Sequence, residues 1–153
     1  MLTRLPKRIA QLRALDRQER HVLFTAIALL PLFSLGLRAF GLVRFQSLLT
    51  RRPLPAQVPT AVDASLLAAQ VNRAARHSPL AVSCLARSLL LGWMLRRRGI
   101  PGELRIGVRL AAGTIEAHAW IECGGVPIND RAAITEEFAA FDRPLLVTSF
   151  RRP

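Results

Sequence analysis

In the middle of the chain the spacing of the apolar residues changes from a helical run to strict alternation. Residues 84–95 are almost entirely apolar, and three arginines, Gly99 and Pro101 follow them. Cations suit the C-terminal end of a helix, and glycine with a later proline ends it. Residues 104–110 then alternate apolar and polar positions, as does a half-buried strand, and residues 114–122 are a second strand-like segment. This order predicts an α+β fold with a helix packed on an antiparallel sheet.

Composition indicates a globular protein. The chain has 153 residues, of which 51% are hydrophobic and 21% charged, which excludes intrinsic disorder and allows one domain with a sizeable core. Two cysteines, 39 positions apart and outside any Cys-x-x-Cys pair, with three histidines, indicate neither a zinc site nor a disulfide framework. We therefore expect no metal, no cofactor and a reducing compartment, the cytoplasm.

The formal charge of +12 is concentrated near the N-terminus. Residues 1–52 hold 10 basic and 2 acidic groups (net +8), and residues 53–153 hold 12 and 8 (net +4). All the basic residues except Lys7 are arginine, a bias that a GC-rich coding sequence also produces. Charge alone is weak support for nucleic-acid binding, and we expect no nucleic-acid partner.

The N-terminal region has an apolar helical pattern. The first twenty residues alternate basic and apolar positions, and residues 22–37 carry no charge but are interrupted by Pro31. Sixteen residues are fewer than the ~20 that a spanning helix needs. Three interpretations stay open: a helical layer on the core, which we favour, a membrane-surface contact, or a secretion signal without a clear cleavage site. A proline-rich linker follows, which divides the chain into a helical region, 1–52, and a second domain, 53–153, that contains the helix-to-strand pattern.

Cys84 stands where a nucleophile would be activated. It opens the predicted helix, and the partial positive charge at a helix N-terminus stabilises a thiolate. A single cysteine is more commonly a small buried apolar residue, but a histidine and an aspartate follow in suitable settings. We expect Cys123 to have no part in the chemistry, and a disulfide between it and Cys84 would remove the nucleophilic thiol.

His118 and Asp130 lie in successive strand-like segments on either side of Cys123, Gly124 and Gly125. A three-residue loop would pair Glu122 with Val126 and place His118 opposite Asp130. A two-residue loop would pair His118 with Arg131 and turn Asp130 to the other face. The favoured register also predicts that the face carrying His118 packs on the helix that begins at Cys84.

Five segments resemble the leader peptidases of lasso-peptide biosynthesis, which belong to the transglutaminase-like branch of papain-like folds. They are Cys84-Leu85-Ala86-Arg87-Ser88-Leu89, residues 95–101, residues 106–108, Ala117-His118-Ala119-Trp120 and Asn129-Asp130. The resemblance implies that Cys84 is the nucleophile, His118 the general base and acid, and Asp130 the residue that orients the imidazole. Backbone donors near Cys84 would serve the oxyanion, since the nearest glutamine, Gln70, lies on another predicted helix.

The resemblance also implies substrate and partners. The substrate would be a ribosomally made precursor peptide, whose leader is removed so that a separate lasso cyclase can form the macrolactam. The region before residue 60 lacks the strand alternation of a winged-helix domain, which implies a separate small leader-recognition protein of that type. Two alternatives stay open: another acyl transfer by the same triad, and a non-enzymatic basic adaptor for a membrane or nucleic acid.

Overall fold

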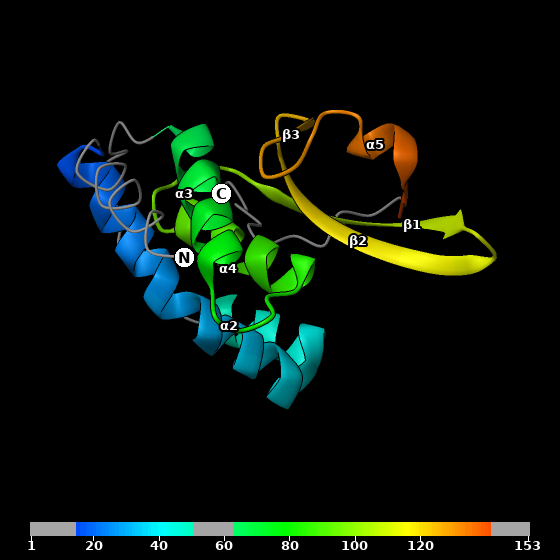
Figure 1. The fold of residues 1–153 in the computed structure, drawn as a ribbon, viewed down its shortest axis with the longest axis horizontal. Coiled ribbons are helices and arrows are strands. Elements are labelled where there is room, and N and C mark those ends of the chain that lie inside the picture. The colour runs from blue at the N-terminus through cyan, green and yellow to red at the C-terminus, as the bar shows by residue number, and fades with distance from the viewer. Residues whose placement is uncertain (1–14, 51–62, 142–153) are drawn as a thin grey trace, which may run out of the picture.

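The computed structural model describes residues 15–50 and 63–141. Three expectations lie outside these ranges: the amphipathic pattern of the first fourteen residues, the proline-rich linker, and a final strand that the apolar sequence after Pro144 predicts for residues 145–150. Within them the helices and strands follow the order α2, α3, α4, β1, β2, β3, α5, β4 (Figure 1).

Helix α2 (Arg17–Thr50) is the longest element, and Pro31 lies inside it. The interruption expected at Pro31 is therefore wrong, because burial of the neighbouring Leu30 and Phe33 holds the helical path across it. The backbone leaves helical geometry instead at Gly41, with φ 70°. The last turns then fold back, so that the Phe45 ring meets Phe33 edge-on with centroids 5.4 Å apart.

Two shorter helices begin at side-chain caps. In α3 (Ala64–His77) the Asp63 carboxylate accepts from the Ser65 N–H at 3.1 Å and so caps the helix. In α4 (Cys84–Arg96) the Ser83 hydroxyl accepts from the Ala86 N–H at 3.1 Å. Gly99 then takes a left-handed φ of 68°, which ends the helix region where the sequence indicates.

The sheet is antiparallel, with strand order β3-β2-β1-β4. Strands β1 (Glu103–Ala111) and β2 (Thr114–Cys123) pair along their whole length, with Gly107 opposite His118. Strands β3 (Val126–Pro127) and β4 (Ala139–Ala140) are short additions at the two edges, and α5 (Ile134–Glu137) lies between them in sequence.

The elements form three layers (Figure 1). Helix α2 is outermost and packs on α3 and α4, and α4 in turn packs on β2 and β1. One apolar core joins these layers through residues of α2, α3, α4 and the sheet, including Leu30, Val71, Leu90, Leu104 and Ile121. The α+β fold with a helix on an antiparallel sheet is thereby confirmed.

Candidate active site

His118 lies on β2 next to two aromatic rings. Its ring stacks near Trp120, with centroids 6.3 Å apart and planes inclined by 21°, and the Phe138 ring lies 5.3 Å away. Trp120 and Phe138 are buried and belong to a small second core with Ile134 of α5. These rings fix the imidazole from one side, so only limited rotation remains to it.

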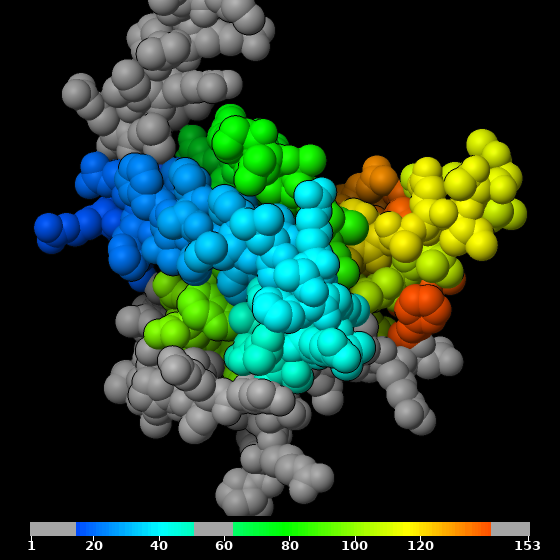
Figure 2. All heavy atoms as spheres, turned by 90° about the horizontal axis from the view of Figure 1, so that it is seen from below, coloured from blue at the N-terminus to red at the C-terminus, as the bar shows by residue number. Residues whose placement is uncertain are grey.

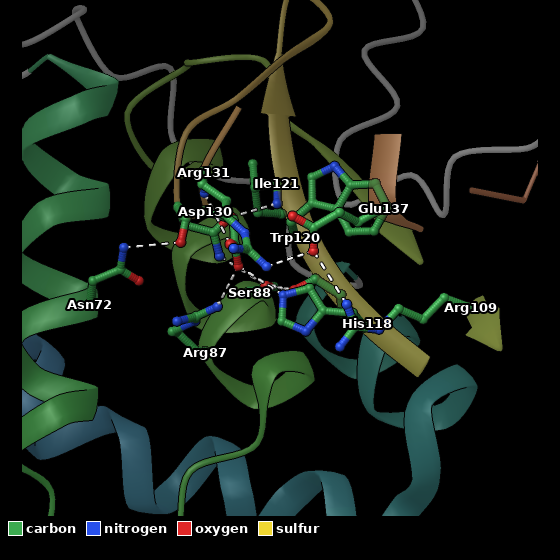
Figure 3. A network of polar contacts seen from close by, with 12 residues as sticks. Asn72, Arg87, Ser88, Arg109, His118, Trp120, Ile121, Asp130, Arg131 and Glu137 are labelled. Carbon is green, nitrogen blue, oxygen red and sulfur yellow. Dashed lines mark hydrogen bonds and ion pairs between the residues drawn. The ribbon is translucent and has the colours of Figure 1, made fainter. Parts of the chain in front are cut away.

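Asp130 meets the other end of this imidazole. His118 Nε2 lies 2.8 Å from Asp130 Oδ2, and both side chains are mostly buried (Figure 3). A carboxylate can only accept, so Nε2 carries the proton and Nδ1 is the basic nitrogen. The pair thus has the polarity that a general base needs.

The predicted three-residue loop, with Glu122 opposite Val126, is wrong. Glu122 pairs with Pro127 and Cys123 with Val126, so the loop is the two-residue turn Gly124-Gly125. Both glycines have positive φ, 60° and 80°, as a type I′ turn requires. Asp130 nevertheless reaches His118, because β3 ends at Pro127 and the chain leaves the strand path before residue 130.

The side chain of Asn129 ends the pairing of this segment with β2. Its Oδ1 accepts from the Ile121 N–H at 2.7 Å, where a strand carbonyl would otherwise bind, and its Nδ2 donates to Ser88 Oγ at 2.9 Å. Ser88 Oγ donates to the Ala119 carbonyl at 3.0 Å, and Asn72 Nδ2 donates to the Asn129 carbonyl at 3.0 Å (Figure 3). These buried bonds join α3, α4 and β2 next to Asp130 and hold its backbone in place.

The expected packing face is also wrong. The core that contains α4 includes Ala119 and Ile121 of β2. These two residues alternate with His118 and Trp120 and therefore lie on the other face of the strand. His118 and Trp120 face α5 instead. The face of His118 also carries Glu116 and Glu122, so the alternation itself assigns the apolar side of β2 to the helix.

Arg87 of α4 reaches the site from the helix side. Its Nη2 lies 3.2 Å from the same Oδ2 that binds His118, and the Arg131 N–H donates to Oδ1 at 3.0 Å. Partial burial works to raise the pKa of Asp130, but the His118 hydrogen bond, the Arg131 N–H and the charges of His118 and Arg87 outweigh it and lower that pKa below its ordinary value. Asp130 is therefore held as a carboxylate.

Cys84 is half-buried at the first position of α4, one turn before Arg87. Two contacts give the direction of the helix along β2: Ser88 bonds to Ala119, and Leu95 lies with Ile121 beside Gly102. Continuing past Ser88 by one turn, about 5–6 Å, carries Cys84 toward the His118 end of the strand. Within residues 15–50 and 63–141, no hydrogen bond joins its Sγ to the His118 ring.

Sequence inspection missed three residues of this site as participants: Arg87, Ser88 and Asn129. Arg87 and Ser88 follow Cys84 by three and four positions, the spacing that puts side chains on one helical face. That spacing was the available signal. In the described parts of the chain, no three His, Cys, Asp or Glu side chains lie close enough to hold a metal ion.

The structure thus brings a strand histidine and the aspartate bound to it next to the helix that begins at Cys84. A family model described as the transglutaminase-like superfamily matches residues 26–142. The chain belongs to this superfamily, which includes cysteine peptidases and acyl transferases. Comparisons with curated proteins and with solved structures found no match.

Proposed function

We propose that the protein is a cysteine peptidase that removes the leader from a ribosomally made lasso-peptide precursor, with Cys84, His118 and Asp130 as its triad. The observation that carries the proposal is the hydrogen bond from His118 Nε2 to Asp130 Oδ2, made one helical turn from the N-terminus of α4. It leaves Nδ1 as the base for a thiol at that terminus.

In the first half of the reaction, Nδ1 takes the Cys84 proton and Sγ bonds to the scissile carbonyl carbon. The C–N bond then breaks as the imidazolium gives its proton to the leaving amine, which is the new N-terminus of the core peptide. Asp130 stabilises the imidazolium without itself taking the proton, because its lowered pKa keeps it charged. The leader remains on the enzyme as a thioester.

Water completes the cycle. Nδ1 takes a proton from water, the oxygen bonds to the thioester carbon, and the C–S bond breaks to release the leader acid and restore the thiol. The first-turn amides of α4 are the donors for the oxyanion. Ser83 satisfies the Ala86 and Arg87 N–H groups in the described chain, which leaves those of Cys84 and Leu85.

Mass spectrometry of a precursor incubated with each variant tests the peptidase role. Cys84→Ala and His118→Ala should lose cleavage by at least a thousandfold while their circular dichroism stays native. Asp130→Asn should be impaired but not dead, since an amide can accept from Nε2 yet stabilises the cation poorly. Cys123→Ser is the matched control and should cleave at the wild-type rate. Full cleavage by the Cys84 variant would remove the assignment.

We further propose that a separate small winged-helix protein delivers the leader, and that a lasso cyclase takes the product. The leader would add a strand to that protein's sheet, which raises its effective concentration at Cys84. Titrating the recognition protein into fixed amounts of enzyme and precursor should raise the rate at least tenfold. A rate that is already maximal without it would place leader recognition within these 153 residues.

A further inference from the structure

The outward face of α2 is apolar and has no protein layer on it among the described residues. Its large side chains are more than two-fifths exposed: Phe24 (59%), Ile27 (46%), Leu32 (59%) and Leu35 (59%). Their spacing of three, eight and eleven residues places them along one side of a helix. We call these four residues the outer face. Phe40 and Val43 continue the apolar exposure around the Gly41 bend.

The opposite side of α2 is already used. Val22, Ala26, Leu30 and Phe33 are at most 5% exposed and pack in the core with α3 and α4. Figure 2 shows α2 in blue and cyan lying across the surface of the molecule, with its outward side uncovered along most of its length. A helix apolar on both sides, of which one is in the core, needs a second apolar medium for the other.

Charges around the outer face are positive. Arg17 and Arg20 precede it, Arg38 and Arg44 follow it, all four are exposed, and none is in an ion pair within the described chain. Residues 1–14 add four basic and no acidic residues in sequence. The acids nearby, Asp16 and Glu19, accept the N–H groups of Gln18 and Asp16 at the start of α2. An apolar strip between cations is the pattern of a helix that lies on an anionic lipid surface.

Length and composition would also let α2 cross a bilayer. Crossing would expose Val22, Ala26, Leu30 and Phe33 to lipid and remove them from the core that α3 and α4 share with the sheet. The uncharged segment 22–37 spans only about 24 Å as a helix, less than the roughly 30 Å of a hydrocarbon core. The packing therefore favours a helix that lies in the interface.

We propose that the outer face of α2 docks this protein on anionic membrane surfaces, with α2 parallel to the bilayer. Phe24, Ile27, Leu32 and Leu35 enter the boundary between headgroups and acyl chains, and the flanking arginines bind lipid phosphates. Helices α3 and α4 lie between α2 and the sheet, so strand β2, which carries His118, is on the side away from the lipid (Figure 1). The proposal is independent of the reaction at Cys84.

Flotation of the full-length protein with lipid vesicles tests it. Vesicles of phosphatidylcholine with about 30% phosphatidylglycerol have a strong negative surface potential. They are compared with pure phosphatidylcholine vesicles. The test variant is Leu32→Gln with Leu35→Gln. The control is Leu110→Gln with Ile115→Gln, two side chains that are 74% exposed at the β1–β2 end, far from α2 (Figure 1).

We expect the wild type to float with anionic vesicles at least tenfold more than with neutral ones. Raising NaCl to about 1 M should weaken this binding, because the Debye length is then only ~3 Å. The Leu32/Leu35 variant should bind anionic vesicles at least tenfold less than the wild type and keep native circular dichroism. The Leu110/Ile115 control variant should bind as the wild type does. No flotation on anionic vesicles, or equal loss in both variants, overturns the proposal. The proposal is also overturned if the wild type binds no vesicles and the Leu32/Leu35 variant instead loses binding to another protein.

Discussion

Asp130 is the residue on which the geometry of the site depends. Its Oδ2 accepts from His118 and Arg87, and its Oδ1 accepts from the Arg131 N–H. Three donors on one mostly buried carboxylate fix its rotamer and keep it ionised, and the fixed carboxylate in turn fixes the tautomer of His118. A residue 43 positions earlier in the chain thus takes part in orienting the base.

Arg87→Met tests this dependence. It removes one of the charges that lower the pKa of Asp130, so that pKa should rise and the acidic limb of the cleavage rate should move to higher pH. A lowered native pKa stabilises the fold above the unfolded value of about 3.9, and the stabilisation disappears as the pH falls through the native value. In the variant this loss should be smaller and should be complete at a higher pH, and stability near pH 7 should fall by about 1 kcal/mol.

Arg87→Lys is the matched control, because it keeps the charge. Its pH profile should lie between those of the wild type and Arg87→Met. Superimposable profiles for wild type and Arg87→Met would mean that the ion pair has no part in setting the charge of Asp130.

At the scale of elements, local signals were sufficient for boundaries but not for the register of β3. The start of α4 at Cys84, the Asp63 cap and the two long strands follow from periodicity and capping, which a sequence displays directly. The two-residue turn at Gly124-Gly125 would turn Asp130 away from His118 if the strand continued beyond it. The strand does not continue, since the Asn129 side chain replaces a ladder bond through contacts with a helix 41 positions away. Such long-range contacts leave no periodic signal.

The small core under His118 gives an element-scale prediction. A Cβ at Gly107 would lie 2.9 Å from both Phe138 Cβ and Trp120 Cη2, closer than side chains tolerate. Gly107→Ala should therefore push apart the two rings that hold the imidazole, cost about 1–3 kcal/mol of stability and lower the cleavage rate at least tenfold. Chemical denaturation and initial rates measure both effects.

Gly113→Asn is the comparison for that variant. Nothing lies within 4 Å of a Cβ at Gly113, and asparagine tolerates its φ of 79°. Stability and rate should stay near the wild-type values. If Gly107→Ala behaves in the same way, the two rings have no role in positioning His118.

At the scale of the whole molecule, α2 is both a core element and a surface element. Its inner side belongs to the same apolar core as α4, the helix that begins at Cys84, and its outer face is exposed. Removing residues 1–52 would uncover that core, so we expect the remainder, 53–153, to be insoluble or unfolded. The expected loss of about 1.5–3 kcal/mol for each large buried side chain is comparable to the whole stability of a domain.

Two leucines of α2 separate these roles. Leu30 is fully buried and Leu32 is 59% exposed. Leu30→Ala should lower the free energy of unfolding by about 2–5 kcal/mol, whereas Leu32→Ala should change it by less than about 0.5 kcal/mol. Equal effects in thermal denaturation, or a soluble and active 53–153 fragment, would show that α2 is not part of the core.

The account rests on His118 and Asp130 serving the thiol of Cys84, and the rate of alkylation of each cysteine tests this most directly. The protein is treated with limiting iodoacetamide at a pH of about 6.5, near the unperturbed pKa of histidine. Peptide mass spectrometry then gives the extent of alkylation of both cysteines in one sample. Burial raises the pKa of the Cys123 thiol, so Cys123 is a slow internal reference. We predict that Cys84 reacts at least tenfold faster than Cys123 in the wild type, and that His118→Ala removes this difference without changing Cys123. Equal Cys84 rates in the wild type and in His118→Ala would contradict the account.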